Sequence, residues 1–474
     1  MNRWSAFILV IIFFPVLIQA QEKWTLEQCI QHAVENNLAI KQSDIQVLSN
    51  QYNYEAAKAS RIPSLNANTF FYESFGRQID PTTNSFNSQS FGNQSYNLNS
   101  RVTIFNFNKI NNSIKQSKLN LLASEADKEQ AIRDIALQVA QAYLIVLIAK
   151  ENLQVAEKSL EQTNEQLKVT DLLIDAGSKN RNSRLEIVAQ QAKNESQVIS
   201  AQNDIAIGLL NLKQTINIDP GLNIDIVIPS VPVPMENPDS LDYETLVASA
   251  FKTQPQFESF DSKIHSALLG EKTAKSQGLP SITMQGSAST TYSTLSRQIT
   301  GTELQRQQIP GAQLNNEAVN FSFLNPVVTT GKNPYFTQLN QNLGFGLGIG
   351  IDIPIFNGLQ VKTNVQQARL NKENIQLQSN QARQQLRSDV LKSLTDARAA
   401  RLNMYSAQKA FEAQSGAYSD TKKRYEIGTA NSFELITSKN NLDTVERDLI
   451  ISRYDYTFKM KVLDYYAGKQ ISFN

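Results

Sequence analysis

The chain has 474 residues, and 45 Lys and Arg residues are balanced by 44 Asp and Glu residues. This balance excludes the large basic surface that nucleic-acid binding requires, so we expect no nucleic-acid partner. Two His and one Cys are too few for an ordinary zinc site, and the sequence shows no phosphate-binding loop or nucleophile elbow. We therefore expect that the protein is not an enzyme and that it has no catalytic residue, cofactor or metal site.

The N-terminus has the pattern of a secretory signal peptide. Arg3 precedes an apolar run of twelve residues over 7–18, and Ala20 supplies a small residue at the boundary. This run is shorter than the roughly 20 residues that a membrane-spanning helix needs. We expect a signal peptide over 1–20, export of the remainder, and no hydrophobic transmembrane helix elsewhere.

The first half of the mature chain is expected to span residues 21–218. Its first helical stretch ends before Pro63, because a proline disfavours helix in the residue that precedes it. Two segments of alternating polarity follow, separated by a polar loop, and then two more helices joined by a glycine-containing turn. The expected elements are helix 26–58, strands 65–75 and 95–105, and helices 109–175 and 183–216.

A proline-rich connector at about 219–240 leads to a second half, residues 241–474, with the same order of elements. Pro63 corresponds to Pro280 at an offset of 217 residues, whereas TIFN at 103–106 corresponds to PIFN at 354–357 at an offset of 251. The sequence therefore predicts a tandem duplication, with a longer loop in the second half. The expected elements are helix 241–276, strands 281–293 and 341–355, and helices 358–426 and 432–467.

The lengths of the expected helices match within each half. The two shorter helices of the first half together have 67 residues, as many as the long helix, and those of the second half have 72 against 69. Two short helices stacked end to end would therefore lie along one long helix. A helix on the order of 100 Å long needs a partner, so we expect long antiparallel coiled-coil packing.

The last expected strand has glycine at every second position, with large apolar residues between. These glycines are Gly344, Gly346, Gly348 and Gly350. Since successive side chains of a strand point to opposite faces, one face would carry glycine alone and the other a bulky row. We expect the bulky row to face lipid, and the glycines to face a channel lumen or the side chains of a neighbouring strand. Pro354 ends the alternation.

All four expected strands have about the length of a tilted membrane-spanning strand, and polar and apolar residues alternate along them. The alternative is a soluble antiparallel sheet that covers a core with one face. Four strands cannot close a barrel, and lipid does not tolerate an open edge. Membrane strands would therefore have to be pooled between chains. Three chains would give twelve strands, although this count does not exclude two or four chains.

Three segments resemble the TolC-like outer-membrane efflux channels, and the resemblance covers essentially all of the mature chain. They are GLGIGIDIPIFNGLQVKTNVQQARL at 346–370, RYEIGTANSFELITSKNNL at 424–442 and ISRYDYTFKMKVLDYYAG at 451–468. The resemblance implies a homotrimer with a 12-stranded barrel in the outer membrane of a Gram-negative cell and a 12-helix tunnel through the periplasm. It also implies a passive exit duct, docked by a periplasmic adaptor and an inner-membrane pump or exporter.

The resemblance also assigns residues to the periplasmic tips of the helical hairpins, where the closed tunnel is constricted. Tyr425, Gly428 and Glu434 match the family's aromatic residue, turn glycine and tip acid, while Arg184 stands where the family usually has an acid. Thr437 also replaces a second acid. We therefore hypothesise an Arg184–Glu434 ion pair between neighbouring hairpins as part of the closed gate. The alternative is a set of solvated charges, because exposed ion pairs contribute only ~0–1 kcal/mol.

The competing function is a periplasmic coiled-coil adaptor or structural protein of the envelope. Such a protein would share the signal peptide and the long helices, but it would lack four alternating strands of membrane length. The substrate class that the family resemblance leaves open includes small molecules and secreted polypeptides.

Overall fold

A computed structural model describes residues 22–80, 84–229, 234, 236–311, 313–315, 317–320 and 322–469. The expected signal peptide and part of the proline-rich connector lie outside these residues. The chain divides into two compact units, and each contains residues from both halves of the sequence. A helical unit comprises the described residues within 1–51, 119–265 and 373–474, and a strand unit comprises those within 52–118 and 266–372.

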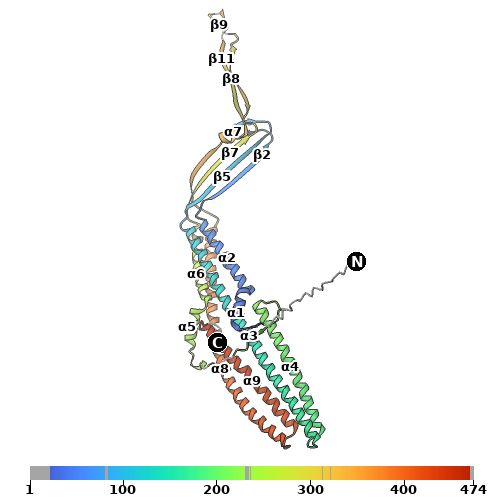
Figure 1. Ribbon diagram of the computed structural model, residues 1–474. Helices are drawn as coiled ribbons and strands as arrows, with labels where there is room; N and C mark the ends of the chain where they lie inside the picture. Colours follow the sequence, from blue (N-terminus) through green and yellow to red (C-terminus); the bar gives the residue numbers. More distant parts are fainter. Residues whose placement is uncertain are drawn as a thin grey trace, which may run out of the picture. The chain divides into compact units, whose positions relative to one another are not determined.

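The strand unit contains an antiparallel sheet of four strands in the order β12-β7-β5-β2 (Figure 1). Its strands are β2 (Ser64–Ser74), β5 (Phe91–Phe105), β7 (Ser281–Ser293) and β12 (Gly344–Asp352). Pro63 and Pro280 stand directly before β2 and β7, and Pro354 follows β12. The four expected strands are thus confirmed, although β5 begins four residues earlier and β12 is shorter than expected.

The long loop of the second half is not the irregular loop that the sequence suggested. β8 (Arg297–Gln308) and β11 (Ser322–Lys332) form an antiparallel ribbon that continues beyond the sheet (Figure 1). Shorter pairs are β9 (Gln313–Leu314) with β10 (Glu317–Ala318), and β3 (Gln78–Asp80) with β4 (Ser85–Asn87). Helix α7 (Tyr335–Gln341) follows the ribbon. The ribbon is largely exposed and rich in Gln and Thr, so its sequence lacks the apolar alternation of a half-buried strand.

The helices follow the expected order, but two expected helices are interrupted. The first half contains α1 (Leu26–Asn36), α2 (Leu38–Ala59), α3 (Lys109–Asp175) and α4 (Arg181–Ile216). The second half contains the short 3-10 helix η1 (Pro238–Ser240), α5 (Tyr243–Thr253), α6 (Pro255–Ser276), α8 (Gln360–Glu426) and α9 (Ser432–Tyr466).

Each interruption is an extended residue between two helices. Asn37 has a ψ of 132°, and its side-chain amide donates to the carbonyl of Thr215 over 2.9 Å. Gln254 has a ψ of 115° and precedes Pro255, which disfavours helix in the preceding residue. The single helices expected over 26–58 and 241–276 were therefore wrong. The proline signal was present in the second case, whereas the Asn37 contact depends on a residue far away in the sequence.

The long helices pair with the shorter ones as their matched lengths suggested. In the helical unit, α3 contacts α2 through an ion pair of 2.6 Å between Lys128 Nζ and Asp44 Oδ1. Nearer its C-terminus the same helix contacts α4, where Asn194 Nδ2 donates to Thr163 Oγ1 over 2.8 Å. Helix α8 contacts α9 through Lys459 in the same unit, and in the strand unit it contacts α6.

The main core of the helical unit surrounds a short parallel pair of strands, β1 (Glu22–Trp24) and β6 (Ile224–Ile226). The Tyr143 hydroxyl of α3 donates to the carbonyl of Val227 over 2.6 Å, next to this pair. Cys29 lies fully buried in the same core, and burial raises the pKa of its thiol to about 12. β6, in the connector after α4, therefore pairs with β1 at the start of the described residues, and the residue after β6 contacts α3.

One helix bears on the expectation that the mature chain has no hydrophobic transmembrane helix. By length and composition, α3 contains a window that is apolar enough to cross a membrane. Several of its apolar residues belong to the core around β1 and β6, where Val139, Val146 and Leu147 are fully buried. Core packing against α1 and α4 thus gives a physical reason for this apolar run.

Candidate functional sites: a two-faced sheet and two hairpin tips

The glycines of β12 lie on a face of the sheet that is polar across all four strands. The register places Gly346 opposite Ser287, Ser287 opposite Asn99, and Asn99 opposite Asn66. The next row consists of Gly348, Gln285, Arg101 and Ser64. These two rows line a hollow of about 780 Å³. We call this surface the polar face.

The glycines leave room for the polar side chains of β7. A Cβ atom at Gly346 would lie only 2.9 Å from Ser287 Oγ, and one at Gly350 would lie 3.3 Å from Thr283 Oγ1. At Gly348 the nearest side-chain atoms would be 3.8 Å away, which is an ordinary contact distance. The two close contacts explain why glycine stands at positions 346 and 350, despite the conformational entropy that glycine costs in a strand.

The opposite face of β12 carries a continuous row of large apolar side chains. Phe345, Leu347, Ile349 and Ile351 are between 65% and 79% exposed. Apolar residues of the neighbouring strands lie in register with this row, such as Met284 opposite Ile349 and Val102 opposite Met284. We call this surface the apolar face. Such a contiguous exposed apolar surface is unusual in a protein surrounded by water.

Aromatic residues lie near both ends of the apolar face. At the end near α7, the Tyr96 and Tyr335 hydroxyl oxygens are 2.6 Å apart, and the Tyr335 and Tyr292 ring centroids are 4.7 Å apart. At the other end of β5, the rings of Phe105, the last residue of the strand, and Phe107 are 4.8 Å apart. Tyr96 and Phe105 are nine positions apart on β5. At about 3.4 Å per residue they lie roughly 31 Å apart along the strand. A strand tilted by about 40° would separate them by roughly 24 Å across the membrane, close to the ~25 Å apolar band of membrane barrels.

The helical unit holds the two hairpin tips, formed by the α3–α4 and α8–α9 turns. Gly177 and Gly428 have φ angles of +76° and +82°, which a residue with a side chain rarely adopts. Tyr425, at the end of α8, is fully buried, and its hydroxyl lies 3.2 Å from Thr170 Oγ1 of α3. Lys179 Nζ lies 4.1 Å from the centroid of the Tyr425 ring. Tyr425 therefore joins the two hairpins.

The hypothesised ion pair between Arg184 and Glu434 is not formed within this chain. Arg184 Nε lies 2.9 Å from Asp171 Oδ1, so the arginine binds an acid of its own hairpin. Glu434 Oε2 lies 3.3 Å from Arg424 Nη2, again within one hairpin. The family resemblance pointed to neither Asp171 nor Arg424, although each lies across the turn of its own hairpin from its partner.

A buried polar cluster, which the sequence reading missed, connects the two hairpins farther from the turns. Ser159 Oγ of α3 donates to Asp443 Oδ2 of α9 over 2.6 Å, and Asp443 also forms a buried ion pair with Lys439. Nearby, Gln190 Nε2 of α4 donates to Asn440 Oδ1 of α9 over 2.8 Å. The four-residue spacing of Lys439 and Asp443 was a signal, but the same spacing is common on solvated helix faces.

Large apolar residues are exposed at both tips. Leu172 and Leu185 are 69% and 64% exposed on the α3–α4 hairpin. Ile427 and Phe433 are 74% and 70% exposed on the α8–α9 hairpin.

Among the described residues, no group of three or more His, Cys, Asp and Glu is arranged to hold a metal ion.

The fold is similar to those of several solved channel structures. CusC superposes with a TM-score of 0.73 at 16% identity, covering 96% of each chain. VceC from Vibrio cholerae gives a TM-score of 0.71 at 15% identity, covering 94% of this chain and 96% of VceC. The CmeC outer membrane channel of Campylobacter jejuni gives 0.70 at 16% identity, covering 94% and 85%.

The sequence matches the family described as outer membrane efflux protein over residues 29–217 and 250–468. No curated protein matches the sequence significantly. The family match covers most of the chain, and the similar structures share its arrangement of strands and long helices. The chain therefore belongs to the outer membrane efflux protein family and is a protein of the outer membrane.

Proposed function

We propose that this protein is the passive exit duct of a tripartite efflux or type I secretion system. The observation that carries the proposal is the sheet, which has one polar face with a large hollow and one exposed apolar face. Such a sheet is suited to separate a water-filled lumen from lipid. The duct would carry small molecules or polypeptides without chemistry of its own.

The functional unit is a homotrimer. Within the described chain, β2 and β12 form the two edges of the sheet. An open edge leaves backbone groups without partners in lipid, so β12 of one chain would pair with β2 of the next. Three chains would close a 12-stranded barrel. The recurring order of elements and the two 67-residue helices support a tandem duplication, which would give each trimer a near-sixfold tunnel of twelve helical columns.

The hairpin tips form the periplasmic gate. Tyr425 and the buried polar cluster hold the two hairpins of a chain together, and Arg184 and Glu434 each form an exposed ion pair within their own hairpin. Polar contacts can break and form again with water or with new partners, so the contacts between these hairpins are suited to a gate that opens and closes, although opening would expose the buried ring of Tyr425. An Arg184–Glu434 pair remains a proposal only for contacts between neighbouring chains.

The exposed apolar residues at the tips form the docking surface for a periplasmic adaptor. Leu172, Leu185, Ile427 and Phe433 offer apolar anchors beside charged groups, a combination typical of protein interfaces. The adaptor would connect the duct to an energised pump or exporter in the inner membrane.

Extraction from the membrane tests the proposal against the coiled-coil adaptor. The duct should resist carbonate and urea and dissolve only in detergent, should run as a heat-sensitive oligomer on an SDS gel, and should conduct ions in a planar bilayer. Release by carbonate, together with the absence of any conductance, would instead favour the adaptor.

A further inference from the structure

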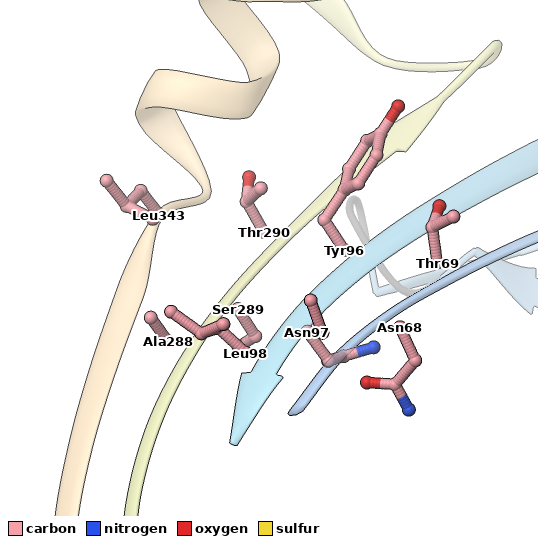
Figure 2. Close-up of a pocket in the computed structure, with 10 residues that line it drawn as sticks. Asn68, Thr69, Tyr96, Asn97, Leu98, Ala288, Ser289, Thr290 and Leu343 are labelled. Carbon is pink, nitrogen blue, oxygen red and sulfur yellow. The ribbon is translucent and has the colours of Figure 1, made fainter. Parts of the chain in front are cut away.

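The apolar face contains a hollow of about 360 Å³ near α7 (Figure 2). Two rows of the register form its floor. One row consists of Ala67, Leu98 and Ala288, and the other of Thr69, Tyr96 and Thr290. In Figure 2, Thr69, Tyr96 and Thr290 project from one side of the sheet, while Asn68 points to the opposite side. The hollow therefore belongs to the apolar face and not to the polar one.

Small residues in the middle of the sheet create this hollow. Ala288 lies between Leu98 and Phe345 in the register, and Phe345 is 79% exposed. In the next row, Ser100 and Gly286 lie between Leu65 of β2 and Leu347 of β12. The short side chains of β7 in these rows, Ala288 and Gly286, thus lie beside the long side chains of Phe345 and Leu347 on β12. This arrangement suits a narrow apolar group that lies against the sheet.

A polar cluster closes one end of the hollow. The Tyr96 hydroxyl oxygen lies 2.6 Å from that of Tyr335, and Gln94 Nε2 donates to Tyr96 over 2.7 Å. Thr290 Oγ1 donates to the carbonyl of Leu339 in α7 over 2.6 Å. Tyrosines with an apolar ring and a polar hydroxyl are enriched where hydrocarbon meets lipid headgroups. The cluster therefore marks the boundary between the chains of a lipid and its polar part.

We propose that this hollow is a binding site for one acyl chain of a lipid of the outer membrane. The chain would lie over Ala67, Leu98 and Ala288, and the polar part of the lipid would contact the hydroxyl and amide groups of Tyr96, Tyr335 and Gln94. The volume is within the range of small-molecule sites, at the lower end of ~300–1,000 Å³. The inference rests on the proposed function, because that function turns the apolar face toward lipid.

Lipid retention by the full-length oligomer tests the site. Ala288→Phe fills the hollow, and Met284→Phe is its matched control, since both residues lie on the same face of β7 and only Ala288 lines the hollow. Ala67→Leu, on the edge strand β2, is a second and milder filling variant. Each oligomer is exchanged into a mild detergent, and its bound lipid is counted by native mass spectrometry and identified by lipid extraction.

The wild-type and Met284→Phe oligomers should retain about one lipid per chain, and Ala288→Phe at least about tenfold less, the fall expected when two buried methylene groups lose their contacts. Ala67→Leu should show a smaller loss in the same direction. Equal retention by wild type and both filling variants, or no retention by wild type, would overturn the site while oligomers and conductance remain intact. Absence of a conducting oligomer in every protein, wild type included, would instead reject the proposed function.

Discussion

The hydroxyl groups of Thr170 and Tyr425 lie 3.2 Å apart and are fully buried, although the two residues belong to different hairpins. Thr170 Oγ1 already donates its hydrogen to the carbonyl of Gln166 over 2.8 Å. Tyr425 is therefore the donor and Thr170 the acceptor. This assignment makes the two ends of the bond unequal, because Thr170 keeps its hydrogen bond to Gln166 when the Tyr425 hydroxyl is removed, whereas the Tyr425 hydroxyl is left buried without its acceptor when Thr170 is removed.

The first prediction uses this asymmetry. Thr170→Val should lower the free energy of unfolding by about 1–3 kcal/mol, since it leaves the Tyr425 hydroxyl buried without its acceptor. Tyr425→Phe should cost about 1 kcal/mol, and the double variant should be close to Tyr425→Phe alone. Chemical unfolding of the detergent-solubilised protein measures these differences. Additive effects of the two changes would show that the two hydroxyls do not interact, and equal costs of the two single changes would contradict the assignment of donor and acceptor.

The second prediction concerns the gate. Tyr425→Ala removes a buried aromatic ring and should destabilise the contact between the hairpins by about 3–5 kcal/mol. We expect a higher resting conductance in planar bilayers and greater sensitivity of cells to a large antibiotic. Leu185→Ala, which removes an exposed side chain at the tip, is a control for closure and should not raise the conductance. Unchanged conductance in Tyr425→Ala would remove Tyr425 from the gate.

The third prediction concerns Arg184 and Glu434. The exposed ion pairs Arg184–Asp171 and Arg424–Glu434 each lie within one hairpin. Each should contribute only ~0–1 kcal/mol to the free energy of unfolding. Double replacement by Ala should therefore leave the unfolding free energy almost unchanged. If the residues also pair between neighbouring chains of a closed trimer, the same double variant should raise conductance and antibiotic leakage. Unchanged conductance and leakage would show that these charges are solvated and have no part in the gate.

The fourth prediction concerns the glycine ladder. Gly348→Phe should narrow the lumen and reduce single-channel conductance and efflux, while the oligomer still assembles, because a Cβ atom there meets only ordinary contacts. Gly346→Phe should act in the same direction but less cleanly, since its Cβ atom would displace Ser287 Oγ. Ile349→Phe, one position along on the apolar face, is the matched control. Equal conductance in Gly348→Phe and Ile349→Phe would contradict the assignment of the polar face to the lumen.

The fifth prediction concerns Glu271 of α6, which forms an ion pair with Lys372 of α8. Hydrogen bonds from Lys275 and Lys372, each with an Nζ–Oε distance of 2.8 Å, lower the pKa of this carboxyl from 4.5 to about 2. Because the folded pKa lies below the unfolded one, the stabilisation is present above about pH 4.5 and is lost as the pH falls toward 2.

Glu271→Gln should therefore unfold at a lower temperature than wild type at pH 7, and the difference should shrink toward pH 2.5. Thermal melts followed by circular dichroism across this range measure the effect. Asp261→Asn, also on α6 but with an acid that is mostly exposed, is a suitable control. A constant difference at all pH values would show that Glu271 contributes through packing rather than through its charge.

Much of the fold was predictable from local patterns. Alternating polarity located the four strands of the sheet, and the repeated proline junctions located the ends of the helices before β2 and β7. Both signals act over a few residues, so they survive without knowledge of distant contacts. The break at Asn37 and the ribbon of β8 and β11 were missed, because one depends on the distant Thr215 carbonyl and the other has little apolar periodicity.

The candidate sites were predicted only in part. The glycine row and Tyr425 stood out as patterns, but their neighbours did not. Ser287 beside Gly346, and Thr170 beside Tyr425, come from strands and helices that are brought together by folding. The hypothesised partners Arg184 and Glu434 were chosen from the family resemblance, whereas the structure gives each a partner in its own hairpin.

The sequence by itself determined the type and order of the elements and the two-sided character of each strand, because both follow from periodicity along the chain. Only the tertiary structure decided the register that assembles four alternating strands into one polar and one apolar face. It also decided which side chains meet at Tyr425 and that Ala67, Leu98 and Ala288 form a hollow. Strand register and side-chain contacts depend on residues far apart in the chain. A pattern along one segment therefore does not identify the segment that packs against it.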